Sequence, residues 1–501
     1  MKSSKRVLII SLVIAVVFVL WGTFLPKHLT EITSNIQDFL QKKFGWFYLL
    51  SATAFLVFVV TMIFSRFGHI KLGKDDEEPE YSYLSWFAML FSAGMGIGLV
   101  FWGVAEPLSH YADPPLAKEG TPQAAQAALE YSLFHWGLHP WGIYTLIGLG
   151  LAYFKFRKNA PGLISSIFTP LLGDRVHGPI GRAIDILAVF ATVFGVATSL
   201  GFGAVQISGG LSFLFKGIEN DFGTQLVIII IVTFLFTLSA LSGLDKGIKY
   251  LSNTNVLLAV LLMLFLFFVG PTNFMMNFFT TTLGAYLQEL PQLSLRITPF
   301  PESELSKWTQ NWTIFYWAWW IAWAPFVGTF IARISRGRTI REFVIGVLTV
   351  PTIFSALWFA ALGGGGIYSE MFQQAGIIEV MNEKGTEIAL FKFLEQYPLS
   401  PILITLAILL ISSFFITSAD SATFVLGMLT TGGRLNPTKS IKLTWGVIQS
   451  AAAVVLLASG GLEGLQTASI IAAFPFTFIM IGIGISLYKT LQTDMPKLRR
   501  R

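Results

Sequence analysis

Aromatic side chains at helical spacing are the residues of this chain best suited to bind something. Five tryptophans and one tyrosine stand within residues 311–326. At about 100° per residue, most of them share one helix face about 100° wide, namely Trp312, Tyr316, Trp319, Trp320 and Trp323. This face rises about 16 Å at 1.5 Å per residue, so it runs through the membrane rather than along its edge. Leucine would pack as well without an indole N–H that needs a partner, and the stretch therefore predicts a binding face.

A second aromatic group stands in "FHWGLHPWGIY". Trp136, Trp141 and Tyr144 lie on one side of a helix at the same angular step, and Pro140 predicts a kink between them. Several rings on one side suit a cation that has no N–H groups, such as a quaternary ammonium, because each ring contributes about 0.5–2 kcal/mol when it is desolvated. The two groups together predict an aromatic site for such a cation.

Three alternate glycines in "SAGMGIG" predict a break in a helix. Gly94, Gly96 and Gly98 each weaken a helix by about 1 kcal/mol relative to alanine. Small residues also serve close helix packing in membranes, but a spacing of two spreads them around the helix and forms no single stripe. Local unwinding would free backbone N–H and C=O groups for a ligand.

Acidic residues within the apolar stretches are few, chiefly Glu106, Asp185 and Asp420. None lies in the glycine segment or in the tryptophan stretch, where a site for a net cation would be expected to hold a counter-ion. The sequence therefore favours a zwitterion that brings its own carboxylate. The positive end of a helix broken at the glycines could receive that carboxylate.

Adjacent hydroxyls at Thr417 and Ser418, in "FFITSADSATF", are candidates for binding a coupling ion. In a membrane helix such hydroxyls more often bond back to their own backbone carbonyls. Beside an unwound helix they could instead supply the oxygen ligands that a hard cation such as sodium takes. Both interpretations stay open at this point.

The elements that must position these residues are membrane-spanning helices. Only 12% of the 501 residues are charged and 54% are hydrophobic, whereas soluble proteins carry about a quarter charged residues. Backbone groups in lipid must be paired internally, and alternating strand-like segments are absent, so an all-α polytopic membrane protein is predicted. Twelve stretches can cross about 30 Å of hydrocarbon, at 7–26, 45–65, 84–108, 131–154, 184–215, 224–242, 249–270, 311–335, 341–363, 400–429, 440–459 and 467–489.

Lysine and arginine positions predict the orientation. With both termini inside, the inner segments hold 25 of the 34 basic residues, as the positive-inside rule requires. The sequence pI of 9.3 then reflects membrane topology and not nucleic-acid binding. We therefore expect a multi-pass protein of the plasma membrane with cytoplasmic N- and C-termini.

Four motifs together resemble those of the betaine/carnitine/choline transporter (BCCT) family, and most closely its bacterial sodium-coupled glycine betaine transporters: "SAGMGIGLVFWGVAEP", "FHWGLHPWGIY", "WTIFYWAWWIAWAPFVGTFIARISRGRT" and "FFITSADSATFVLGM". The resemblance implies a homotrimer, no cofactor, sodium as the coupling ion, and import of an osmoprotectant by alternating access. It also implies two inverted five-helix repeats, spans 3–7 and 8–12, after two extra helices, with an amphipathic helix outside after span 7. The chain then divides into a segment with two peripheral helices (1–83), a transport core (84–489) and a basic tail (490–501).

The resemblance also assigns site residues, position by position. The substrate site would comprise the three glycines already named and an aromatic box of Trp136, Trp141, Tyr144 and Trp320. Trp319 and Trp323 would line the path towards the cytoplasm. One sodium site would comprise Ser92, Met95, Phe414, Thr417 and Ser418. A second would comprise Thr192, Phe326 and Tyr144.

Three positions refine the expectation. Val196 stands one turn after Thr192, where the betaine carriers have another threonine, which leaves the second sodium site and the stoichiometry open. Choline-selective members carry an acid at the position of Gly98, so the glycine favours a zwitterion. Sodium-independent carnitine exchangers place an arginine where Asn255 stands, so sodium dependence is favoured.

Other functions were weighed against this one. Within the family, a choline, carnitine, ectoine or proline carrier is the nearest alternative. A channel would need charged or carbonyl rings along a pore. An enzyme is not expected, because no serine stands in a nucleophile elbow and no metal-ligand spacing joins the histidines His69, His110, His135, His139 and His177.

Overall fold

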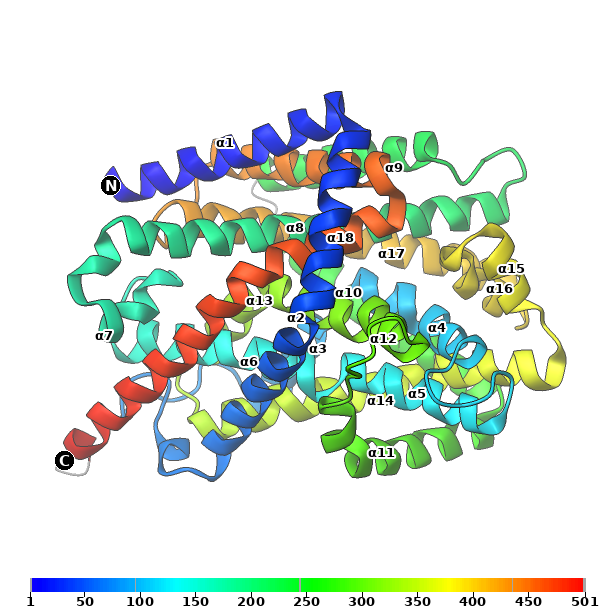
Figure 1. Ribbon diagram of the computed structural model, residues 1–501, viewed down its shortest axis with the longest axis horizontal. Coiled ribbons are helices and arrows are strands. Elements are labelled where there is room, and N and C mark those ends of the chain that lie inside the picture. Colours follow the sequence, from blue (N-terminus) through cyan, green and yellow to red (C-terminus); the bar gives the residue numbers. More distant parts are fainter. Residues whose placement is uncertain (1, 95, 243–244, 435, 499–501) are drawn as a thin grey trace.

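The computed structural model describes residues 2–94, 96–242, 245–434 and 436–498, and these are almost entirely helical (Figure 1). The α-helices are α1 Lys2–Phe24, α2 Pro26–Phe64, α3 Tyr83–Gly94, α4 Ile97–Ala112, α5 Pro122–Trp136, α6 Leu138–Ala152, α7 Thr169–Leu172, α8 Pro179–Leu214, α9 Phe222–Ser242, α10 Asp245–Val269, α11 Thr272–Ser294, α12 Glu304–Thr309, α13 Phe315–Arg333, α14 Ile340–Gln373, α15 Ile377–Lys384, α16 Ala389–Leu394, α17 Ser400–Thr430 and α18 Lys439–Leu498. Short 3₁₀ or π turns are η1 Arg66–His69, η2 Tyr153–Arg157, η3 Ser165–Phe168, η4 Gly173–His177, η5 Gln310–Ile314 and η6 Thr386–Ile388. In the described ranges the β pairing is confined to an isolated bridge between Lys71 and Thr339, so the all-α prediction is confirmed.

The helices correspond to the predicted spans with three differences. Among the described residues, 9 helices are long and apolar enough to cross a membrane. Spans 84–108 and 131–154 are each broken into two shorter helices, α3/α4 and α5/α6. The last two spans are joined in α18, where Gly461 has non-helical φ 57° and ψ −137°. A glycine adopts this left-handed φ without the steric cost of a Cβ, so α18 consists of two helices that meet at a kink at Gly461.

The glycine segment is broken as predicted. α3 ends at Gly94, and α4 begins at Ile97 after Gly96, whose φ of −162° and ψ of −176° are extended. Met95 lies outside the described residues. No side chain caps the start of α4, so the first N–H groups of this helix are left without helical partners.

The second break falls at Gly137 rather than at Pro140. Gly137 has φ −99° and ψ −126°, between α5 and α6. Proline has no N–H to bond the carbonyl of the residue four positions earlier, and its ring clashes with that carbonyl, here the one of Trp136. The interruption therefore appears one turn before Pro140, at the residue with the greatest backbone freedom.

Two helices extend past their predicted ends. α2 has 39 residues instead of the segment 45–65, and α14 has 34 instead of 341–363. The added turns are more polar, so hydropathy alone did not predict them as part of the helices. The amphipathic helix predicted after span 7 is α11, which buries one face through Met275, Thr282, Tyr286 and Leu293.

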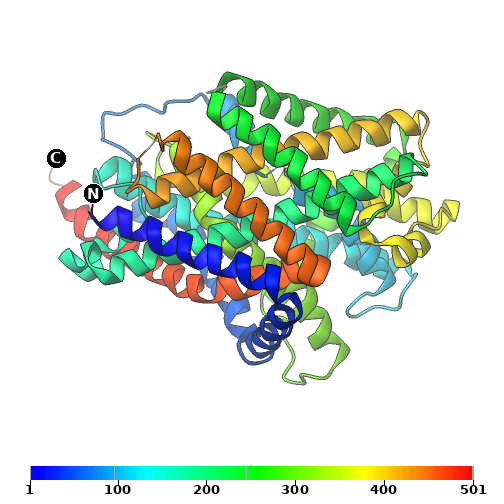
Figure 2. The same cartoon turned by 90° about the horizontal axis from the view of Figure 1, so that it is seen from above.

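The arrangement places both termini at one end of the molecule, on the left in Figures 1 and 2. α15 and α16 lie at the opposite end. α13 is central, since it packs against α6, α8 and α18. α6, α8 and α13 are therefore the scaffold on which the candidate site residues meet.

Candidate functional site

The aromatic residues predicted from two distant motifs meet in one group, the aromatic box of Trp136, Trp141, Tyr144 and Trp320. The ring centroids of Trp136 and Trp320 are 4.8 Å apart, and those of Trp141 and Tyr144 are 5.4 Å apart. Tyr144 and Trp320 join the two pairs at 6.2 Å. All four are buried. The four rings therefore lie close together, with Trp136 on α5 and Trp141 and Tyr144 on α6, on either side of the break at Gly137.

That break also holds Trp320 in place. Because α5 ends at Trp136, the carbonyl of His135 is one of the last in its helix and lacks a helical partner. The indole Nε1 of Trp320 donates to this oxygen at 2.9 Å. A main-chain acceptor thus fixes the orientation of a box ring on α13.

The glycine break lies directly against the box. A Cβ placed on Gly98 would meet ring carbons of Trp319 at 2.7 Å and of Trp136 at 3.1 Å. Around Gly96 such an atom would meet nothing within 4 Å. The uncapped start of α4 therefore presents free N–H groups, with the partial positive charge of a helix N-terminus, beside the aromatic rings.

The remaining tryptophans of α13 separate into two sides, as their angles predict. Trp319 stacks on Trp320 with centroids 4.7 Å apart, and Trp323 donates from Nε1 to the backbone oxygen of Gly195 at 2.5 Å. Trp317 faces away from the box and stacks on His139 at 4.9 Å. The Nε1 atoms of Trp317 and Trp319 are buried without a hydrogen-bond partner in the described part of the chain.

The residues proposed for the first sodium site that the structure describes lie on two helices, Ser92 on α3 and Phe414, Thr417 and Ser418 on α17. The Thr417 hydroxyl donates to backbone oxygens of its own helix, Ser413 at 3.0 Å and Phe414 at 3.2 Å. This back-bonding is the structural alternative raised from sequence, and it leaves the oxygen lone pairs available to a cation. α17 packs against α4, whereas Ser92 lies on α3, before the break.

The second set spans neighbouring helices. Thr192 on α8 is fully buried and donates to the carbonyl of Ala188 at 2.7 Å. Phe326 on α13 stands edge-on to Trp323 at 5.2 Å, and Trp323 reaches Gly195 on α8. Thr192 and Phe326 thus lie on helices in contact near this point, while Val196 occupies the next turn as a buried apolar residue.

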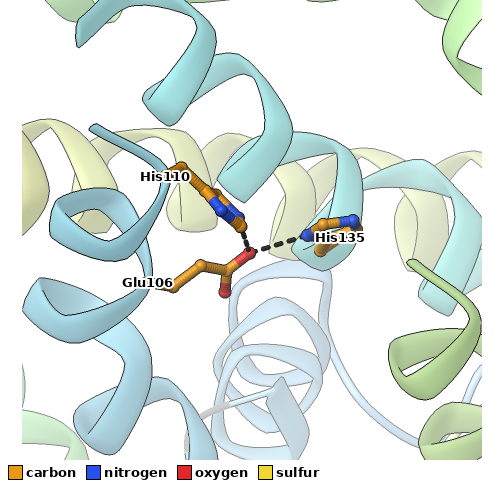
Figure 3. A group of neighbouring side chains, drawn as sticks. All are labelled: Glu106, His110 and His135. Carbon is orange, nitrogen blue, oxygen red and sulfur yellow. Dashed lines mark hydrogen bonds and ion pairs between the residues drawn. The ribbon is translucent and has the colours of Figure 1, made fainter. Parts of the chain in front are cut away.

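An acidic side chain among the aromatic residues corrects the expectation that no acid lies there. Glu106 on α4 is fully buried together with His110 and His135 (Figure 3). Its Oε1 stands 3.2 Å from Nε2 of His110 and 2.7 Å from Nδ1 of His135. Its Oε2 accepts from Nε1 of Trp136 at 2.7 Å and from the Tyr316 hydroxyl at 2.5 Å.

Glu106, His110 and His135 also have the separation of metal ligands, with one ligand atom from each within 4.8 Å of the others. The histidines show no metal-ligand spacing in the sequence, as stated above, but the fold brings His110 and His135 together with Glu106 at metal-ligand separations. The distances from Glu106 Oε1 to the two histidine nitrogens are also hydrogen-bond distances, so these three side chains can pair without an ion. The i,i+4 spacing of Glu106 and His110 was a sequence signal for two of these three residues.

A cavity of about 980 Å³ approaches the box from the side where α1 joins α2. Its wall includes Trp21 and Thr30 near that junction, and Trp102 and Trp312 deeper inside. Trp312 stacks towards Tyr316 at 6.4 Å, and Tyr316 towards Trp320 at 5.7 Å. A run of aromatic rings therefore connects the cavity wall to the box.

Comparison with known proteins gives a consistent result. The chain matches the BCCT betaine/carnitine/choline family transporters over residues 6–496. It is 56% identical over 501 residues to the glycine betaine transporter OpuD of Bacillus subtilis, covering 100% of this chain and 97% of that one. It is 48% identical over 498 residues to a probable glycine betaine transporter of Desulfitobacterium hafniense, covering 99% of each. It is 44% identical over 496 residues to the ectoine/hydroxyectoine transporter of Virgibacillus pantothenticus, covering 99% and 98%.

Proposed function

Because the chain belongs to the betaine/carnitine/choline transporter family, we propose that it imports glycine betaine by sodium symport with alternating access. Its family membership makes the protein a multi-pass membrane transporter and not an enzyme. Glycine betaine is the substrate in the names of the two relatives that are 56% and 48% identical. The function of this chain as an importer of an osmoprotectant rests on that substrate.

The observation that carries the proposal is the aromatic box next to an uncapped helix start. A trimethylammonium group has no N–H to donate, so it is bound by ring faces, which the box supplies. A carboxylate is bound by free N–H groups at a helix N-terminus, which α4 supplies at Gly96 and Gly98. Glycine betaine carries these two groups one carbon apart, and the closeness of Gly98 to the Trp136 ring supports a single site for both.

Sodium coupling is supported by the surroundings of Thr417. The Asn255 side chain accepts from the Ser413 hydroxyl at 2.5 Å, and Ser413 in turn accepts from Thr417 through its backbone oxygen. Asn255 on α10 therefore contacts α17 one turn before Thr417. An arginine at position 255 could replace the charge of the ion there. This chain has a neutral amide there, so the site would need the ion itself. Ser92, Met95, Phe414 and Ser418 complete the proposed set.

The orientation and assembly are part of the same proposal. Both termini lie at one end (Figures 1 and 2), which we place in the cytoplasm of a bacterial cell because the inner segments carry most of the basic residues. The cavity beside the α1–α2 junction then opens towards the outside. Its aromatic wall would pass the substrate to the box, from which Trp319 and Trp323 lead inwards. We propose a homotrimer, with residues 84–489 as the transport core and the inverted-repeat relation of spans 3–7 and 8–12 as predicted.

Uptake into proteoliposomes tests the function. Labelled glycine betaine is offered with and without an inward sodium gradient, with unlabelled choline, carnitine and ectoine as competitors. Saturable uptake that is lost without sodium is expected, with only weak competition by choline, carnitine and ectoine. Uptake that rises linearly with concentration would indicate a channel. Stronger competition by ectoine would move the substrate assignment towards the relative that is 44% identical.

Replacing Gly98 by alanine is expected to lower betaine affinity about tenfold. The added methyl would stand 2.7 Å from the Trp319 ring and 3.1 Å from the Trp136 ring, and overpacking of this kind costs about 1–3 kcal/mol. The dissociation constant is measured by titration of the purified protein. Gly284→Ala is the matched control, because Gly284 is exposed on α11 with nothing within 4 Å of its Cβ position. Unchanged affinity in Gly98→Ala would place the substrate elsewhere.

A further inference from the structure

The Glu106 carboxylate is surrounded by side chains that can donate hydrogen bonds to it. A carboxylate offers about four lone-pair positions, and four side chains stand at hydrogen-bond distance: His110, His135, Trp136 and Tyr316. An indole N–H can only donate, so at least the Trp136 contact requires an acceptor on Oε2. The arrangement is the one that an ionised carboxylate takes.

The two imidazoles do not neutralise this charge. Nδ1 of His110 is buried without a partner among the described residues, so a proton there would be an unsatisfied donor. Nε2 of His135 stands 3.0 Å from the Thr313 hydroxyl, which can donate to it while Nδ1–H donates to Glu106. Hydrogen-bond partners thus assign one proton to each ring, and the cluster keeps a net negative charge.

This charge is connected to the aromatic box by two side chains. Trp136 is a box ring, and its N–H donates directly to Oε2 at 2.7 Å. Tyr316 donates to the same oxygen at 2.5 Å and stacks on Trp320, another box ring, at 5.7 Å. An anion that accepts from an indole N–H pushes electron density into the ring, and hydrogen-bonded groups polarise one another in a medium of low dielectric constant. The ring face that meets a cation becomes more negative.

We propose that Glu106 is a positioning and specificity-determining residue that serves as a remote counter-ion for the quaternary ammonium group, acting through Trp136 and Tyr316 rather than by contact. The inference rests on the proposed function. It explains how a box in which no acid touches the ligand can favour a positively charged group over a neutral one of equal shape. A carboxylate held behind the rings leaves room in front of them for the substrate carboxylate at the start of α4, and does not compete with it there.

The test compares glycine betaine with tert-butylacetate, the isostere in which carbon replaces the quaternary nitrogen. Dissociation constants of both are measured on the purified full-length protein and on Glu106→Gln. Because both ligands carry the same carboxylate, its repulsion by Glu106 cancels when the two are compared. We expect Glu106→Gln to lower the preference for betaine over tert-butylacetate about tenfold, about 1.4 kcal/mol. Coulomb's law at an effective dielectric constant of about 20 gives an effect of this size for charges about 10 Å apart.

Two further variants separate charge from shape. Glu106→Asp retains the charge and is expected to keep most of the preference for betaine over its isostere. Tyr316→Phe retains the charge but removes one of its two links to the box, so its preference is expected to lie between those of the wild type and Glu106→Gln. Equal weakening of both ligands in Glu106→Gln, or no weakening of either, would overturn the proposal in favour of a merely structural hydrogen-bond cluster.

Infrared difference spectroscopy of the unmodified protein covers the case in which Glu106→Gln does not fold. Adding betaine is expected to perturb the stretching band of an ionised buried carboxylate, which shifts in Glu106→Asp. A band from a protonated carboxyl in its place would overturn the proposal. Wild-type protein that does not bind betaine at all would instead overturn the proposed function, so the two failures are distinguishable.

Discussion

Trp320→Leu is expected to weaken glycine betaine binding about 30-fold and to abolish uptake at micromolar substrate. Trp320 touches two other box rings, Trp136 and Tyr144, and it is buried, so its interaction with a cation is desolvated. A desolvated cation–π contact contributes about 2 kcal/mol, and leucine has no π face to replace it. Binding is measured by titration, and uptake by labelled betaine in proteoliposomes.

Two controls make this prediction specific. Trp320→Phe keeps a ring face and is expected to bind more tightly than Trp320→Leu. Trp317→Leu removes an indole of similar burial from the same helix, but Trp317 stacks on His139 away from the box, so betaine affinity should be retained even where thermal stability falls. Equal loss of affinity in the Trp317 and Trp320 variants would mean that α13 is only a packing element.

Thr417→Ala combined with Ser418→Ala is expected to raise the sodium concentration for half-maximal uptake at least tenfold. A hydroxyl that donates to its own helix still offers lone pairs to a cation, and removing two hard oxygen ligands leaves the ion with fewer of the ligands it prefers. Uptake of labelled betaine is measured across a sodium series, with betaine binding measured in parallel at saturating sodium.

The same helix supplies the control for the sodium prediction. Thr405 is exposed on α17 and makes the same back-bond, to Pro401 at 2.7 Å, so Thr405→Ala is expected to leave sodium dependence unchanged. Thr417→Ser keeps the hydroxyl and should recover most of the wild-type response. A double variant with unaltered sodium dependence would show that Thr417 and Ser418 only serve their own helix.

Glycine spacing and helical periodicity predicted much of this site, because helix breaks and helix faces depend mainly on residues close together in the sequence. The break between Gly94 and Ile97 follows from glycine spacing, and the outward face of Trp317 follows from its angle on the helix. The exact position of the second break did not follow, since Pro140 acts on the carbonyl of Trp136 and the chain interrupts at Gly137.

The Glu106 cluster could not be predicted because it is tertiary. Its members come from α4, α5 and α13, whose contacts no periodicity specifies. No acid lies in the glycine segment or in the tryptophan stretch, which favoured a zwitterion. Glu106 lies outside both segments and yet bonds to Trp136 and Tyr316. The helix ends were missed for a simpler reason: hydropathy marks only the part of α2 and α14 that lies in hydrocarbon.

The length of α2 has a consequence for the surrounding lipid. Its 39 residues would span about 58 Å at 1.5 Å per residue, nearly twice the thickness of about 30 Å that the acyl chains provide. Figure 1 shows α2 running from the end of α1 obliquely across the front of the molecule. Only its apolar residues, 45–64, need to match the acyl chains, and at about 30 Å they do so closely. The polar turns of residues 26–44 therefore extend α2 beyond the hydrocarbon, so this helix should contact lipid headgroups along nearly half of its length.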